Sequence, residues 1–197
     1  AGVGTNGGSF AFNVKENNYL GEGKNVGFNM EIDQESIKGT LNYTNPNYDF
    51  LGNALRYYLT SETNDQPDQG YENTIIGAGI STTFEQYNDV YTTLGINAAH
   101  DDLQTLDNAS ASLKKQSGTF DEISGTYGFT FDKRNRSFMP TDGSIISFNQ
   151  SLPIYADKSF ISNTLSASTY RTITEDVIGA TKIYLSAING LGSDDVR

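Results

Sequence analysis

The sequence predicts an all-β protein, an antiparallel transmembrane β-barrel, and three features carry this prediction. Bulky apolar residues alternate with polar ones along most of the chain, with the period of two that is typical of strands. The polar positions hold mainly Ser, Thr, Asn and Gly, which suit a water-filled interior. No apolar run approaches the ~18 residues that a transmembrane helix requires.

The alternation begins near the N-terminus. In residues 9–15, Phe10, Phe12 and Val14 share one face and the residues between them share the other. Each segment spans about 8–11 residues, the length that crosses a bilayer at the tilt of barrel strands, and we count about ten full strands and the stub of another in a meander. In the other segments the alternation is identified at residues 25–33, 37–43, 53–60, 76–80, 94–98, 126–131, 146–152, 165–168 and 182–187.

The composition of the polar face distinguishes a membrane barrel from a soluble β-sandwich. A sandwich exposes a charged outer face and packs its apolar faces together, whereas charged residues are few at the strand positions of this chain. The chain has 12 Tyr and 11 Phe, and many stand near segment ends, as an interfacial aromatic girdle requires. The barrel is favoured, and a soluble sandwich adhesin is a minor alternative.

The segments between the strands fall into two alternating sets, as the two rims of a barrel require. One set contains the two longest segments and many acidic residues, so we expect it to face the outside of the cell. It comprises residues 5–8, 33–36, 61–72, 99–120 and 155–159, and the other set comprises residues 18–23, 47–52, 85–89, 136–143 and 174–176.

Composition leaves little room for covalent or metal chemistry. The chain has 197 residues with no Cys and one His, which excludes thiolate and zinc–sulfur sites. No second His or Cys completes a site with His100, and we expect this residue at a strand end or in a loop. A net charge of −11 argues against nucleic acid as a partner. We therefore predict no enzymatic activity, no cofactor and no metal site.

We interpret both ends of the chain as points at which a longer protein has been truncated. The N-terminus reads Ala1-Gly2-Val3-Gly4 without a signal segment, and the C-terminus stops at Arg197 in a loop-like stretch. Outer-membrane barrels commonly end on a strand with a terminal aromatic residue. We expect residues 1–197 to form one partial barrel domain, truncated at both ends, that aggregates or needs detergent by itself.

The segment from Phe131 to Gly143 has a more defined order of residue types than a rim turn requires. A strand ends at Phe131, Pro140 stiffens the turn, and Gly143 permits a positive φ before the next strand. The residues follow the order Asp-x-Arg-x-x-x-Phe-x-Pro-Thr-x-Gly, with Asp132, Arg134, Phe138, Pro140, Thr141 and Gly143 at the named positions.

This motif resembles the mid-barrel motif of the bacterial surface-antigen family. Residues 15–23 are similar to the family's Asn-aromatic-Leu-Gly-x-Gly turn, and Tyr43–Tyr48 is similar to its Thr-Asn/Glu-Pro-aromatic turn. The resemblance runs through essentially the whole chain and implies roughly the first two-thirds of a barrel of about sixteen strands. The early turn contributes Asn18, Leu20, Gly21 and Gly23.

The resemblance implies a function without covalent chemistry. The family's assembly branch lies in the outer membrane of Gram-negative-type cells, accepts unfolded barrel precursors and assists their insertion. Accessory assembly lipoproteins and outer-membrane lipids are its further implied partners. Its first strand pairs weakly with the last, and an exposed edge can template an incoming strand. In this chain Gly2, Val3 and Gly4 would belong to that lateral seam, and the motif residues would fix a rim turn, with Arg134 directed toward an acidic partner.

Two other functions fit the same strand pattern. A two-partner secretion pore, from another branch of the family, would export a polypeptide. A plain porin would conduct solutes through a stable channel.

Overall fold

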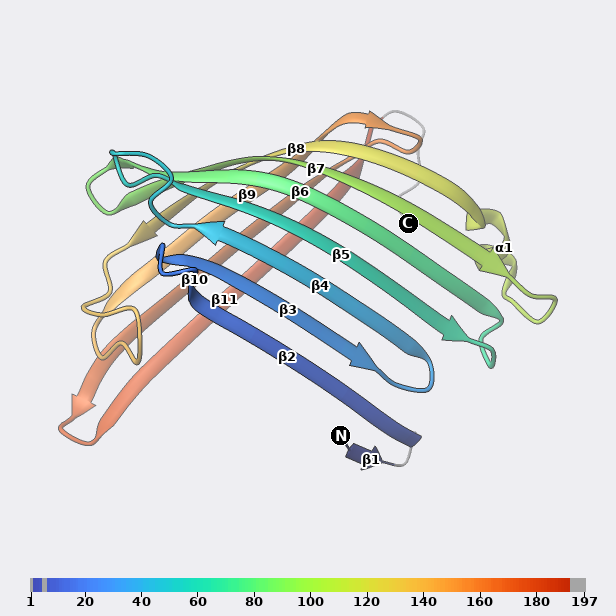
Figure 1. Cartoon of the computed structure of the whole chain (residues 1–197), viewed down its shortest axis with the longest axis horizontal. Helices are drawn as coiled ribbons and strands as arrows, with labels where there is room; N and C mark the ends of the chain where they lie inside the picture. The colour runs from blue at the N-terminus through green and yellow to red at the C-terminus, as the bar shows by residue number, and fades with distance from the viewer. Residues whose placement is uncertain (1, 5–6, 192–197) are drawn as a thin grey trace.

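The chain folds into one curved antiparallel sheet of 11 strands that follow one another in sequence order (Figure 1). The computed structural model describes residues 2–4 and 7–191. The all-β class, the meander and the expected number of strands are confirmed. The strands are β1 (Gly2–Gly4), β2 (Gly7–Tyr19), β3 (Lys24–Ile32), β4 (Ser36–Asn45), β5 (Ala54–Gln66), β6 (Tyr71–Tyr87), β7 (Val90–Thr105), β8 (Gly118–Asp132), β9 (Gly143–Ala156), β10 (Phe160–Thr174) and β11 (Val177–Gly190).

Several strands are longer than the sequence predicted. β6 has 17 residues and β7 has 16. Because β5 continues to Gln66 and β7 to Thr105, most of the loop expected at residues 61–72 and part of the loop expected at residues 99–120 are strand. The ladder continues through acidic residues, with Asp101 paired to Ile75 and Asp102 paired to Thr74. Beyond the bilayer a hairpin needs only backbone hydrogen bonds, and its side chains need not alternate in polarity. The shortened loop after β7 also contains a helix that was not predicted, α1 (Ala111–Gln116).

One face of the sheet is apolar and lies open. Antiparallel pairing aligns Phe28, Leu41, Leu59, Ala78 and Ala98 in one row across five strands. No second sheet covers this face in the described part of the chain, where Leu103 and Ala109 are the apolar residues that are buried. A sandwich would bury such a face, so the arrangement favours a surface that meets lipid. Its exposed members include Phe10, Phe12, Val14, Ile80, Leu94, Ile96, Ile146, Ile183 and Leu185.

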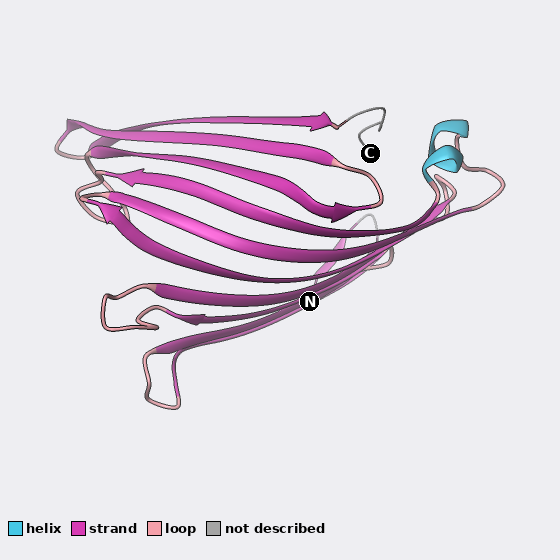
Figure 2. Cartoon of the chain, turned by 90° about the horizontal axis from the view of Figure 1, so that it is seen from above, coloured by secondary structure: helices cyan, strands magenta, loops and turns pink. Residues whose placement is uncertain are grey.

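The opposite, polar face is concave. The sheet curves into an open trough (Figure 2), and Ile75 of β6 and Ile188 of β11 line one cavity on this side although four strands separate them. Further along the trough, the Tyr58 hydroxyl donates to Asn97 Oδ1 at 2.9 Å across the intervening strand. A Cβ at Gly79 would collide with both side chains, so this glycine lets the phenol lie flat against the wall. No helix among the described residues is long and apolar enough to cross a membrane.

The turns form two groups at opposite ends of the strands, as predicted from their alternation along the chain (Figure 1). The inner rim is defined here as the end that carries residues 20–23, 46–53, 88–89, 133–142 and 175–176. The outer rim carries residues 33–35, 67–70, 106–117 and 157–159. Which rim faces the cell exterior stays a prediction.

Candidate functional site

The motif segment forms the turn between β8 and β9 on the inner rim, and an ion pair holds its first half. Arg134 Nε and Nη2 donate to the two carboxylate oxygens of Asp132 at 2.8 and 2.6 Å. Arg134 Nη1 also donates to the carbonyl of Ser137 at 3.3 Å. The pairing raises the pKa of the Arg134 guanidinium above its ordinary value. The acidic partner that the sequence led us to expect in the lumen is thus a neighbour within the motif, at an inward-facing position of β8.

Asn135 organises the second half of the turn, although it was not among the predicted motif residues. Its Oδ1 accepts from the backbone N–H groups of Thr141 and Asp142 at 3.1 and 3.3 Å. Its Nδ2 donates to the Thr141 hydroxyl at 2.7 Å. Asn commonly bonds nearby backbone in turns, so its presence in this loop was the available signal.

Gly143 starts β9 with a backbone that only glycine adopts easily. Its φ is +97°, and an added Cβ would meet the carbonyl oxygen of Lys133 and lie 2.9 Å from Arg134 Cα. Met139 also has a positive φ, of 48°. Phe138 is 79% exposed, so this motif aromatic projects from the rim and is not packed into the wall. Pro140, another motif residue, follows Met139 and is half-buried.

The motif turn is also bonded to the strands on both sides. Asp132 N donates to the Asp89 carbonyl at 3.0 Å, which joins the turn after β6 to the end of β8. Thr172 of β10 donates to the carbonyl of Thr141 at 3.1 Å. These bonds tie the motif turn to its neighbours along the rim from β6 to β10.

The early turn closes through Asn18. The Gly23 backbone N–H donates to Asn18 Oδ1 at 2.7 Å, and the Gly21 N–H donates to the Asn18 carbonyl at 3.0 Å. Leu20, Gly21 and Gly23 all have positive φ, of 56°, 76° and 68°. Glycine at two of these positions relieves the strain of the left-handed conformation, and Leu20 is exposed at the tip.

The residues assigned to the lateral seam form β1, which pairs with the outer-rim end of β2. Gly2 pairs with Ser9, Val3 with Gly8, and Gly4 with Gly7. Ala1, which would continue the seam, lies outside the described residues. The pairing shows that this segment adds to the edge of the sheet next to β2.

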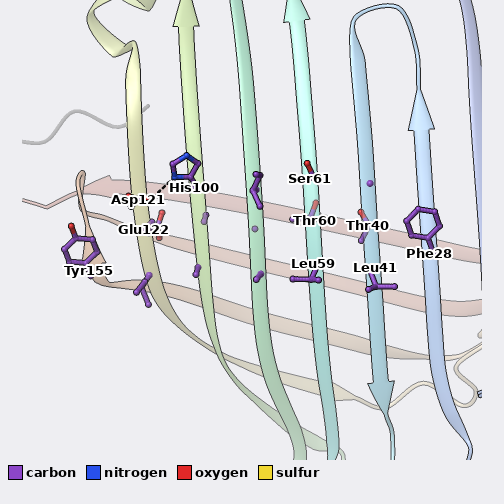
Figure 3. Close-up of a pocket in the computed structure, with 17 residues that line it drawn as sticks. Phe28, Thr40, Leu41, Leu59, Thr60, Ser61, His100, Asp121, Glu122 and Tyr155 are labelled. Carbon is purple, nitrogen blue, oxygen red and sulfur yellow. Dashed lines mark hydrogen bonds and ion pairs between the residues drawn. The ribbon is translucent and has the colours of Figure 1, made fainter.

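His100 lies inside β7, so the prediction of a strand end or a loop is wrong. Because β7 continues to Thr105, the imidazole sits on the apolar face, with its Nδ1 2.7 Å from Asp121 Oδ1 of β8. Figure 3 shows the pair at one side of a groove over β3 to β9. The floor includes the small residues Gly39, Ala78 and Ala98.

The described residues contain no group of three or more His, Asp or Glu side chains placed to hold a metal ion. The described residues thus form a curved sheet with an apolar convex face, a polar concave face and a hydrogen-bonded motif turn at the inner rim.

Comparison with known proteins relates this architecture to a solved structure and to a protein family. The crystal structure of BamA from Haemophilus ducreyi lacking POTRA domains 1–3 superposes with a TM-score of 0.77 at 22% identity, over 97% of this chain and 40% of that one. The chain thus has the fold of part of the BamA structure and spans less than half of its length. The Omp85 superfamily domain matches residues 18–197, and the chain therefore belongs to the Omp85 superfamily.

Proposed function

We propose that this chain is part of the membrane wall of a protein that assembles and inserts β-barrel precursors into an outer membrane. The observation that carries the proposal is the Omp85 match over residues 18–197. The fold shared with BamA from Haemophilus ducreyi gives it structural support. On this proposal the chain is one partial barrel domain and an integral part of the outer membrane.

The faces of the sheet suit this location. The open apolar face would meet the lipid chains, and the concave polar face would line the water-filled interior. Strand insertion needs no covalent step, because an incoming strand gains its stability from backbone hydrogen bonds to an available edge. We place that edge at the β1 side, where Gly2, Val3 and Gly4 would contribute to the seam.

The proposed partners follow from this role. Unfolded barrel precursors would reach the inner rim from the periplasm, outer-membrane lipids would contact the apolar face, and accessory lipoproteins would assist from the inner side. The motif residues Asp132, Arg134 and Gly143 would act by holding the rim from β6 to β10.

The test is reconstitution of the full-length protein in lipid vesicles with a urea-denatured barrel precursor. We expect the precursor to become protease-protected and to migrate as a folded barrel on unheated gels, faster than in empty vesicles. A precursor that folds at the rate of empty vesicles would contradict the proposal. Transport of a soluble polypeptide across the vesicle membrane would instead identify a secretion pore, and stable single-channel conductance without assembly would identify a porin.

A further inference from the structure

A polar pocket lies on the concave face of β2 to β5. Its floor is Gly27 of β3, where an added Cβ would meet no atom within 4 Å. The pairing register places Lys15 of β2 on one side of Gly27 and Asn42 of β4 on the other. Asn25 and Asn29 occupy the neighbouring inward positions of β3. With residues from the adjoining strands, these side chains line a cavity of about 310 Å³.

The side chains around Gly27 are mainly hydrogen-bond donors. Arg56 reaches the pocket from β5, and its Nη2 donates to Asn42 Oδ1 at 2.8 Å. Asn13 Nδ2 donates in the same way to Asn29 Oδ1. Each accepting amide uses its oxygen in these bonds and keeps its Nδ2 group to donate to a ligand. Together with the Lys15 ammonium and the other guanidinium N–H groups, the lining favours a group that accepts several hydrogen bonds.

No carboxylate neutralises the cations of this pocket. Its lining contains no Asp or Glu, and neither Lys15 nor Arg56 forms an ion pair with any residue that the structure describes. The other lysines on β3 and β4 are paired, Lys24 with Glu22 and Lys38 with Glu62. This unpaired positive charge is a local feature of the pocket, because the chain as a whole has a net charge of −11. A guanidinium, an ammonium and amide N–H groups together match a carboxylate.

We propose that the pocket over Gly27 binds the C-terminal carboxylate of an incoming barrel precursor, an inference that rests on the proposed function. Strand direction supports this choice of ligand. β2 runs toward the inner rim, so β1 runs away from it. A precursor strand that adds antiparallel to β1 therefore runs toward the inner rim, and its C-terminus emerges there.

The distances are short enough for this contact. Lys15 precedes the inner-rim end of β2 at Tyr19 by four residues, which is about 13 Å along an extended strand. β3 is the second strand from β1 and so the third from a strand added beside β1, a lateral separation of about 14 Å. A chain that ends at the seam can span this separation with about four extended residues. The site would recognise the negatively charged end of the precursor in addition to the backbone hydrogen bonds of strand pairing. It would thereby discriminate a terminal strand from an internal one.

The test uses the full-length protein in detergent and two synthetic peptides. Both carry the same ten-residue alternating strand sequence that ends in Phe, one with a free C-terminal carboxylate and one with a C-terminal amide. Fluorescence anisotropy of an N-terminal label gives the two dissociation constants. We expect the acid peptide to bind about tenfold more tightly, a difference of about 1.4 kcal/mol.

Substitutions then test whether the preference for the acid peptide arises from this pocket. The double variant Lys15→Gln, Arg56→Gln should bind the two peptides equally, whereas the charge-conserving variant Lys15→Arg, Arg56→Lys should retain the preference. Lys182→Gln is the matched control, because Lys182 is also exposed and stands on the polar face, in β11. Folding of each variant is checked by its migration on unheated gels, and the exposed positions of both cations make misfolding unexpected.

Several results would overturn the inference. The first is equal affinity of the wild-type protein for both peptides, and the second is a preference for the acid peptide that survives the double substitution. The third is a loss of this preference in Lys182→Gln, which would show that the overall positive charge of the polar face and not this pocket binds the acid. The vesicle assay keeps the two proposals separate. Assembly without a carboxylate preference would refute the pocket alone, and a mapped carboxylate preference without assembly would refute the proposed function while supporting the pocket.

Discussion

Replacement of Gly143 by Ala tests whether the motif turn is a fixed structural element. Gly143 has a φ of +97°, and an alanine Cβ there would meet the Lys133 carbonyl and approach Arg134 Cα to 2.9 Å. Both obstacles are backbone atoms, so a change of side-chain rotamer cannot relieve the contact. The turn would have to open at the point where the Lys133 N–H donates to the Ser144 carbonyl at 2.8 Å.

The expected cost combines backbone strain with steric overlap. A non-glycine residue in such a region of φ costs about 1–3 kcal/mol, and overpacking against rigid atoms costs about 1–3 kcal/mol. Partial relaxation of an exposed turn lowers the sum, and we expect a loss of about 3 kcal/mol in the free energy of unfolding. Gly39→Ala is the matched control, because a Cβ at Gly39 meets nothing within 4 Å. A glycine replaced without strain changes stability by about 0.4–1 kcal/mol in the favourable direction.

The assay is urea unfolding of the full-length protein in lipid vesicles, followed by the folded fraction on unheated gels and by tyrosine fluorescence. The Gly143 variant should unfold at a clearly lower urea concentration than the wild type, and the Gly39 variant should not. If both variants unfold together, or if the Gly143 variant matches the wild type, the turn does not hold the geometry that we describe and the reasoning fails.

Three further predictions use the same preparations. Arg134→Lys should lower the free energy of unfolding by about 1–2 kcal/mol, because an ammonium cannot reproduce the two-point contact with Asp132. Tyr58→Phe should cost about 1 kcal/mol in the same urea assay, since it removes a hydroxyl that donates at 2.9 Å across the wall. The backbone N–H of Asn53 bonds the Asp49 carboxylate and lowers its pKa below 3.8. The ionised Asp49 therefore stabilises the turn at residues 46–53 at pH values above the ordinary pKa of the carboxyl. This stabilisation is lost as the pH falls through the lowered pKa of the folded state. An NMR titration of Asp49 with a midpoint at or above 3.8 would contradict this prediction.

The faces of the sheet could be predicted from the sequence because antiparallel pairing puts directly opposite residues on the same side. The alternation of Phe10, Phe12 and Val14 with polar residues therefore fixed the orientation of β2, and the same reasoning held for later strands. The rim membership of the turns followed from their order. Strand ends were predicted less well, because the alternation stops where the bilayer stops, while the β6–β7 ladder continues through Asp101 and Asp102.

Contacts between strands could not be predicted, because they depend on register. Lys15 and Arg56 are 41 positions apart, and nothing in their spacing indicates that they share a pocket over Gly27. The pair of His100 and Asp121 depends in the same way on the alignment of β7 with β8. Asn135 was overlooked for a different reason, since its three bonds to Thr141 and Asp142 form only after the turn has closed.

The inner rim is bonded unevenly, and this bears on where the wall can move. From β6 to β10, hydrogen bonds connect turns to neighbouring strands, from Asp132 at the end of β8 to Asp89 and from Thr172 of β10 to Thr141. The turns at residues 18–23 and 46–53 instead bond to themselves, as in the Asn18 contacts with Gly21 and Gly23. Bonds within one turn keep its shape but do not resist a shift of neighbouring hairpins. The hairpins next to β1 are joined through the β3–β4 ladder and not through their inner-rim turns, so the bracing of turn to neighbouring strand is confined to the side of the sheet that holds the motif, away from the edge beside β1.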